Sequence, residues 1–149
     1  MNTNNQLEVL QLHTGKEFAA SPSPFMLWLK PIILSAEQGK LSFQYRIRKE
    51  MTNPMGTLHG GITAAIMDDV IGSTMFSFNE EYFYTTVNNV IDYFAPAKEN
   101  DLIIADTTVI KKGKQIVNAQ CEIWNADKTR LIARGYSNLL KTERKKENS

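Results

Sequence analysis

One segment constrains the fold of this chain more than any other, the apolar stretch from Ile62 to Phe78. It is rich in Ala, Met and Ile, and it is too long and alternates too little in polarity to be a strand. The stretch therefore predicts a helix. Because apolar residues occupy most of its circumference, we expect other elements to cover this helix on several sides.

Runs typical of β-strands lie on both sides of this helix. Before it, Ile32 to Ser35 and Leu41 to Arg48 flank a turn and predict a hairpin, since the second run alternates between apolar and polar residues. Four more runs follow and predict an antiparallel meander: Tyr84 to Phe94, Leu102 to Lys111, Gln115 to Trp124 and Leu131 to Leu140. This order predicts an α+β fold with the helix against a curved sheet.

The 149 residues fit one domain. We expect an N-terminal helical extension over residues 1–30, the main domain over 31–141 and a disordered charged tail over 142–149.

The net charge of +1 provides no field that would recruit nucleic acid or an acidic membrane surface. The sequence contains no apolar run of ~18 residues, so we expect no membrane-spanning segment. A single cysteine, Cys121, suits a reducing compartment, so we expect a cytoplasmic protein.

The segment Asn53-Pro54-Met55-Gly56-Thr57-Leu58-His59-Gly60-Gly61 comes directly before the helix. Glycine allows the backbone to approach a ligand closely, and the first turn of a helix offers unpaired amide N–H groups at its positive end. Such a site can hold an anion or the negative oxygen of a tetrahedral intermediate.

The predicted helix also carries two adjacent carboxylates, Asp68 and Asp69. A carboxylate in apolar surroundings is costly unless it is paired, and such groups are candidates for a general base or a nucleophile. Helix geometry alone does not choose between the two. Metal ligation is not expected, because the two histidines, His13 and His59, have no Cys or carboxylate cluster at ligand spacing.

The pattern Asn53-x-x-Gly56-x-x-His59-Gly60-Gly61, with six residues between Gly61 and Asp68, resembles the signature of the hotdog-fold thioesterases. It is most similar to the branch that contains the phenylacetate-pathway (PaaI-like) thioesterase and thioesterase superfamily member 2. The similarity continues through Thr85-Thr86-Val87, Tyr93 to Lys98 and Lys111 to Lys114. It implies a hotdog fold, in which a curved antiparallel sheet wraps around one long central helix, and an acyl-CoA thioesterase that acts on an acyl- or aryl-acyl-CoA.

The resemblance implies five catalytic residues. The amide of Gly60 would donate to the thioester carbonyl oxygen, and Asn53 and His59 would position this loop and the substrate. Asp68, which the resemblance favours over Asp69, would activate water or attack the carbonyl directly. Thr86 would orient Asp68 or the water. Asn88-Asn89 departs from the alternation expected of a strand at this point.

The resemblance also implies a channel for coenzyme A, which is part of the substrate, so no cofactor or metal is expected. Its substrate-binding residues would be Gly61, Tyr93, Pro96, Lys98, Lys111 and Lys114. The basic turn that contains Lys111 and Lys114 is often only a solvated surface feature. The alternative activities are a non-catalytic, regulatory acyl-CoA-binding protein on the same fold and another hotdog enzyme such as a dehydratase.

One subunit should not be sufficient for catalysis. Eight residues of helix separate Gly60 from Asp68, which corresponds to ~12 Å. Both groups must approach the same reacting centre to within ~3 Å. A second, antiparallel copy of the helix could bring its Asp68 beside the first copy's Gly60. We therefore expect a homodimer at minimum, and the resemblance implies a homotetramer built as a dimer of dimers.

Overall fold

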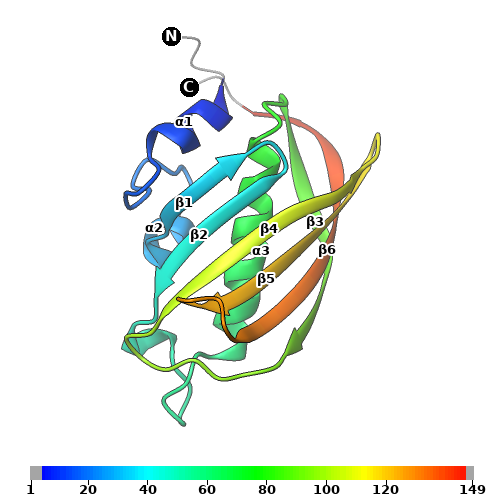
Figure 1. The fold of residues 1–149 in the computed structure, drawn as a ribbon. Coiled ribbons are helices and arrows are strands. Elements are labelled where there is room, and N and C mark those ends of the chain that lie inside the picture. Colours follow the sequence, from blue (N-terminus) through cyan, green and yellow to red (C-terminus); the bar gives the residue numbers. More distant parts are fainter. Residues whose placement is uncertain (1–4, 147–149) are drawn as a thin grey trace.

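The computed structural model describes residues 5–146 and confirms the α+β hotdog architecture (Figure 1). The long helix is α3, Gly60–Phe76, and a six-stranded antiparallel sheet curves around it. The remaining helices are α1 (Gln6–Leu12), α2 (Pro24–Leu29) and a 3-10 helix (Lys49–Met51). The strands are β1 (Ile32–Glu37), β2 (Lys40–Arg46), β3 (Tyr82–Tyr93), β4 (Leu102–Lys112), β5 (Ile116–Asn125) and β6 (Leu131–Lys145).

The strand order is β1-β2-β4-β5-β6-β3. The predicted hairpin is confirmed as β1–β2, and β4, β5 and β6 form a meander as predicted. The prediction was wrong for β3, which pairs with β6 at the edge of the sheet and not with β4. The connection after β3 carries the chain along the lower edge of Figure 1 to the end of β2, where Ile47 N donates to Asp101 O (3.0 Å) and Asn100 N donates to Ile47 O (2.7 Å).

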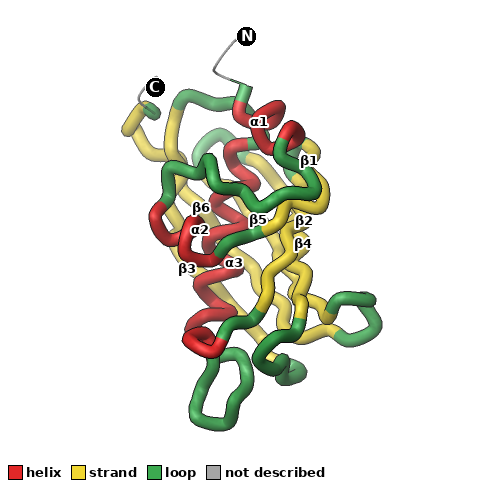
Figure 2. Tube along the Cα trace, turned by 90° about the vertical axis from the view of Figure 1, so that its left-hand side faces the viewer, coloured by secondary structure: helices red, strands yellow, loops and turns green. Residues whose placement is uncertain are grey.

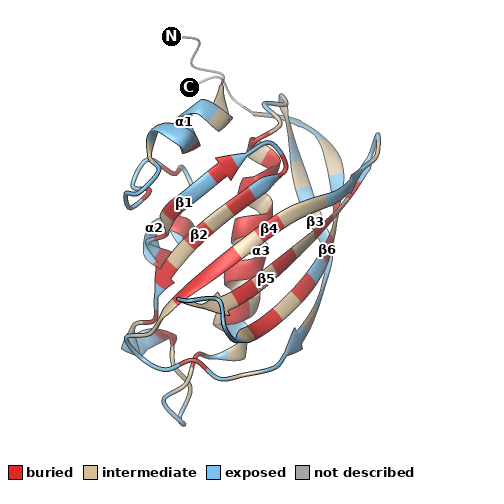
Figure 3. Cartoon of the chain, viewed as in Figure 1, coloured by how far each residue is buried: buried red, intermediate tan, exposed pale blue. Residues whose placement is uncertain are grey.

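The sheet covers α3 on several sides, as its apolar composition predicts, and α3 contacts strands β2 to β6. Figure 3 shows buried and less buried residues alternating along β5, whose buried face carries Val117, Ala119, Cys121 and Ile123. On β6, Gly135 faces α3 so closely that an added Cβ would lie 2.6 Å from the sulfur of Met67. The wrapped sheet therefore approaches the helix at van der Waals distance.

The two edges of the sheet differ. The edge formed by β1 is covered by the segment before it, since Gly15 N donates to Ile33 O (2.7 Å) and Phe18 N donates to Pro31 O (2.9 Å). The opposite edge, β3, has no partner on its outer side among residues 5–146. Its side chains Val87 and Val90 are 60% and 57% exposed. One long apolar edge is therefore open.

The chain ends differ in part from the expected division. Two short helices, α1 and α2, lie within residues 5–30, and Figure 2 shows α2 beside α3 on the side not covered by the sheet. Strand β6 continues to Lys145, which pairs with Tyr82, so residues 142–145 are a strand and not a disordered tail. The long β3 provides the partner that orders them. Residues 147–149 lie outside the described residues. Among residues 5–146 no helix combines the length and apolar composition needed to span a bilayer.

Candidate functional site

The loop before α3 is held by the side chain of Asn53. Its Oδ1 accepts from the amides of Met55 (3.0 Å) and Thr57 (3.1 Å), and its Nδ2 donates to Thr57 Oγ1 (2.8 Å). Gly56 completes the turn with a φ of +75°, which favours glycine. Asn53 therefore fixes the conformation of the loop that leads to the helix.

His59 is the N-cap residue of α3. Its Nδ1 accepts from the amide of Gly61 (2.8 Å), so this nitrogen is unprotonated in the neutral ring. Among residues 5–146 the amide of Gly60 donates to no protein acceptor, which leaves it available at the positive end of the helix. Tyr93 Oη donates to the carbonyl of Gly60 (2.8 Å), which anchors the first turn to the end of β3.

The segment after β3 borders the same loop. The amide of Leu58 donates to Ala97 O (2.7 Å), and Thr57 forms a β-bridge with Lys98. Tyr93, Pro96 and Lys98 therefore lie near the N-terminus of α3, together with Gly60 and Gly61. The loop held by Asn53, the end of β3 and the segment after β3 therefore meet at this end of the helix.

Asp68 lies two turns further along α3, on a face that the sheet leaves exposed. Its Oδ1 accepts from Thr86 Oγ1 (2.7 Å), which is one of the two contacts, to Asp68 or to the water, that the resemblance implied. The same oxygen accepts from Asn89 Nδ2 (3.4 Å), a residue to which sequence analysis assigned no role. Asp68 is therefore oriented from β3 by two neutral donors.

A β-bulge explains the unusual Asn88-Asn89 pair. Thr86 faces Leu139 of β6, Asn88 faces Asn138 and Asn89 faces Ser137, so Val87 is an extra residue in β3. Bulges occur often beside active sites, where they redirect side chains. Here the bulge turns both Thr86 and Asn89 toward Asp68. Departure from the alternation was the only signal of this arrangement in the sequence.

The structure separates Asp68 from its neighbour Asp69. The Oδ2 atom of Asp69 is buried and has no hydrogen-bond partner among the described residues. Burial, and then the charge of Asp68, raise the pKa of Asp69 from its ordinary 3.8 to about 7. The hydroxyl of Tyr45 is also buried without a partner, and burial followed by the charge of Asp69 raises its pKa. Asp69 therefore faces the core, whereas Asp68 faces outward.

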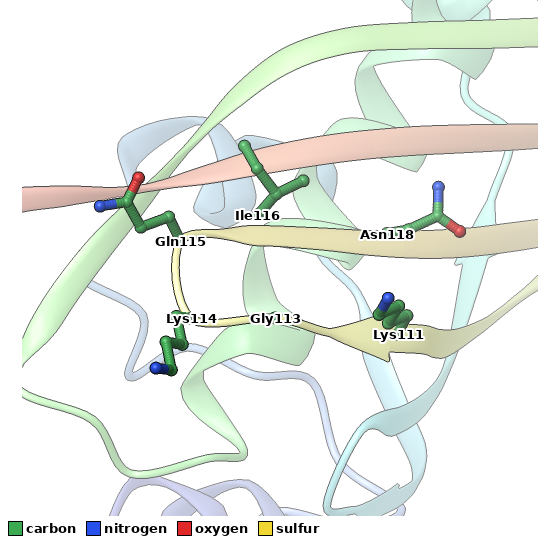
Figure 4. A pocket seen from close by; sticks show the side chains of 6 residues that line it. All are labelled: Lys111, Gly113, Lys114, Gln115, Ile116 and Asn118. Atoms are coloured by element: carbon green, nitrogen blue, oxygen red, sulfur yellow. The ribbon is translucent and has the colours of Figure 1, made fainter.

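Lys111 and Lys114 do not join this cluster. They lie on the β4–β5 hairpin, where Ile116 pairs with Leu140, which in turn pairs with Thr85 near the start of β3. Tyr93 is eight residues further along β3, ~26 Å away. Around the hairpin is an open depression of about 500 Å³ (Figure 4). The predicted substrate-binding residues thus fall into two groups at opposite ends of one subunit.

The described residues hold no group of three or more His, Cys, Asp or Glu side chains that could bind a metal ion. The groups arranged here are a hydrogen-bonded carboxylate, a helix N-terminus with a free amide, and the loop braced by Asn53. Chemically, a carboxylate can accept a proton from water or attack a carbonyl, and a free amide can stabilise a developing oxyanion.

Comparisons with known proteins agree with this geometry. The sequence profile of the thioesterase superfamily matches residues 55–132. Human acyl-coenzyme A thioesterase 13 is 31% identical over 106 residues, which are 71% of this chain and 76% of that protein. The crystal structure of mouse thioesterase superfamily member 2 superimposes with a TM-score of 0.72 at 26% identity, covering 95% of this chain and 97% of that one. The structure of the Escherichia coli PaaI protein, from the phenylacetic acid degradation operon, gives 0.78 at 17% identity, with 96% of each chain covered.

Proposed function

The chain belongs to the thioesterase superfamily, and we propose that it is an acyl-CoA thioesterase, which hydrolyses an acyl- or aryl-acyl-CoA to a free acid and coenzyme A. The observation that carries this proposal is the Thr86–Asp68 hydrogen bond on the exposed face of α3, whose N-terminus presents the free amide of Gly60. Hydrolysis of a thioester by this route needs both features, a carboxylate that activates water or attacks the carbonyl and a donor that stabilises the oxyanion.

Asp68 activates the hydrolytic water in this proposal. The carboxylate takes a proton as the water oxygen attacks the carbonyl carbon, and it returns that proton to the thiolate sulfur when the C–S bond breaks. The other route is direct attack by the carboxylate on the carbonyl carbon, which breaks the C–S bond, releases coenzyme A as the thiolate and leaves an anhydride that water then hydrolyses to the free acid. Both routes need a carboxylate held in one orientation, and the hydrogen bond from Thr86 supports this requirement.

Gly60 stabilises the negative oxygen of the tetrahedral intermediate through its amide. The contacts of Asn53 within the loop and of His59 at the helix N-terminus support a positioning role for both residues, since each side chain holds backbone next to that amide. The reaction uses no cofactor beyond the coenzyme A of the substrate.

Each active site combines groups from two subunits. Within one subunit, Gly60 and Asp68 are eight residues of helix apart, ~12 Å, which is too far for both to act on one carbonyl. The exposed edge of β3 supports a two-fold dimer in which two β3 strands pair antiparallel, because unpaired backbone groups and apolar side chains favour such pairing. The helices then run antiparallel, so Asp68 of one copy can approach Gly60 of the other.

The same two-fold arrangement reunites the two groups of substrate-binding residues. The hairpin with Lys111 and Lys114 lies at the Thr85 end of β3, and Tyr93, Pro96 and Lys98 lie at the other end. Antiparallel pairing places the hairpin of one copy at the Tyr93 end of its partner. We propose that the phosphates of coenzyme A bind near these lysines, and that two such dimers form a tetramer in the cytoplasm. Neither nucleic acid nor a membrane is needed as a partner.

Thiol release tests the activity. A panel of acyl-CoAs of increasing chain length, with one aryl-acyl-CoA, is assayed with a chromogenic thiol reagent. Wild type should release thiol, Asp68→Asn should lose at least ~100-fold in kcat, and Asp127→Asn, in the β5–β6 turn, serves as the matched control. Equal rates for wild type and Asp68→Asn would overturn the role of Asp68. Binding of acyl-CoA without turnover by wild type would favour the regulatory alternative.

Complementation tests the shared site. Asn53→Ala and Asp68→Ala proteins should each be inactive, whereas a mixed dimer has one intact site. With random exchange, half of the dimers are mixed and half of their sites are intact, so about a quarter of wild-type activity should return. No recovery, although native mass spectrometry shows exchange, would contradict a site built from two subunits.

A further inference from the structure

We infer that Asn89 is a positioning residue for Asp68 that fixes one carboxylate oxygen and leaves the other free for the reaction. The inference rests on the proposed role of Asp68 in thioester hydrolysis. Thr86 and Asn89 both donate to Oδ1 of Asp68, at 2.7 and 3.4 Å. Among residues 5–146, Oδ2 of Asp68 accepts no hydrogen bond, so this oxygen is the one available to a water or a carbonyl carbon.

Ser137 sets the orientation of the Asn89 amide. Its side chain is buried on β6, and its hydroxyl donates to Asn89 Oδ1. The carboxylate of Asp68 can only accept hydrogen bonds, so the amide must direct its NH₂ group there and its oxygen to Ser137. The three residues form a chain of hydrogen bonds, from the hydroxyl of Ser137 to the amide oxygen of Asn89 and from the NH₂ group of Asn89 to the carboxylate of Asp68.

The bulge makes this chain of contacts possible. In a regular strand, Thr86 and Asn88 would share a face and Asn89 would point to the other side. With Val87 inserted, Asn88 turns outward and accepts from Asn138 (Nδ2, 3.1 Å), and Asn89 turns toward α3. Two neighbouring asparagines on one bulge thus have different environments, which provides a matched pair for mutagenesis.

Substitution of each asparagine tests the inference on kinetics. Asn89→Leu should lower kcat about three- to tenfold with little change in KM, since a hydrogen bond to a charged group is lost while the substrate-binding residues remain. Thr86→Ala, which loses the shorter bond, should lower kcat further, and Asn88→Leu should leave kcat unchanged.

Asn89→Asp should cause a larger loss at neutral pH and move the acidic limb of the kcat/KM profile to higher pH, because a second carboxylate then faces Asp68. Asp69, the other titratable neighbour, is the same in every variant.

Double substitution tests the link through Ser137. If Ser137 acts only by orienting Asn89, Ser137→Ala should lower kcat by a similar factor, and Ser137→Ala/Asn89→Leu should be no slower than Asn89→Leu alone. Additive losses, or equal losses for Asn88→Leu and Asn89→Leu, would overturn the inference. Thermal unfolding of each variant identifies any loss that comes from misfolding.

A measurement independent of turnover separates this inference from the proposed function. In a ¹⁵N–¹H NMR spectrum, acidification should shift the side-chain amide signals of Asn89 in wild type, and Asp68→Asn should abolish this shift. The amide of Asn88 is the internal control. If wild type hydrolyses no acyl-CoA, the proposed function fails while this contact can still be observed. If the Asn89 signals behave in the same way in wild type and in Asp68→Asn, the inference fails even when the enzyme is active.

Discussion

Replacement of Asp69 by Asn should change the pH dependence of stability. Asp69 has a buried oxygen without a partner, and burial together with the charge of Asp68 raises its pKa from 3.8 to about 7. Below pH ~4 the carboxyl is protonated in both the folded and the unfolded state. Between pH ~4 and ~7 Asp69 is ionised in the unfolded chain but stays largely protonated in the folded protein. The free energy of unfolding therefore falls as the pH rises.

The size of this effect follows from the raised pKa. A tenfold change in proton affinity corresponds to ~1.4 kcal/mol, so a pKa raised from 3.8 to about 7 is worth at most about 4 kcal/mol. Partial exposure of the residue reduces this ceiling. Above pH ~7 Asp69 is ionised in the folded protein as well, and the free energy of unfolding falls no further. Asn cannot ionise, so Asp69→Asn should lack this pH-dependent loss.

Urea denaturation at pH values from 4 to 8, at one fixed subunit concentration, measures the effect. The difference in the free energy of unfolding, Asp69→Asn minus wild type, should rise steadily from pH 4 to 7 and then level off. Asp127→Asn is the control, because hydrogen bonds from Thr129 lower the pKa of Asp127 below its ordinary 3.8. The Asp127 carboxyl is then ionised in both the folded and the unfolded state above pH ~5, so Asp127→Asn should change the free energy of unfolding by a nearly constant amount over this range. A constant difference between pH 4 and 8 for Asp69→Asn as well would refute the assignment of Asp69 as a buried, unpaired carboxyl.

Three further substitutions test the packing. Gly135→Ala should lower stability by about 1–3 kcal/mol in urea denaturation, because the new Cβ would lie 2.6 Å from the sulfur of Met67; an unchanged value would contradict the close approach. Thr107→Val should cost about 1–3 kcal/mol, since the buried hydroxyl accepts from the amide of Leu41 (3.2 Å), and Thr107→Ser should recover most of this loss. Tyr45→Phe should be neutral or raise the melting temperature, because it removes a buried hydroxyl without a partner; a clear fall would reveal a hydrogen bond at this site.

Local pattern in the sequence predicts most of the elements. The apolar stretch after Gly61 is long enough to exclude a strand, and alternation from Leu41 to Ile47 identifies the buried face of β2. The glycines directly before a helix indicate a candidate anion site at the loop, and the spacing of Asn53, Gly56 and His59 identifies this loop because it resembles the thioesterase signature.

Features that depend on contacts between elements far apart in the sequence could not be predicted from local pattern. The sequence from Tyr84 to Phe94 indicates a strand, but it does not say that β6 is the neighbouring strand. The roles of Asp68 and Asp69 separate only when the directions of the two side chains are known, because adjacent positions on a helix differ by 100°. Asn89 contacts Asp68 through a bulge that inserts one residue, and no local pattern predicts where a register shifts.

The covered β1 edge has a consequence for growth of the assembly. A sheet that can accept another strand on both sides can continue without limit, as in fibrils. Here the residues around Gly15 cap one side, so within residues 5–146 strand pairing can add a neighbour only along β3. In the proposed dimer the two β3 edges pair with each other, so the described part of neither copy keeps a second free edge, and a polymer of β-sheets could not elongate by strand pairing.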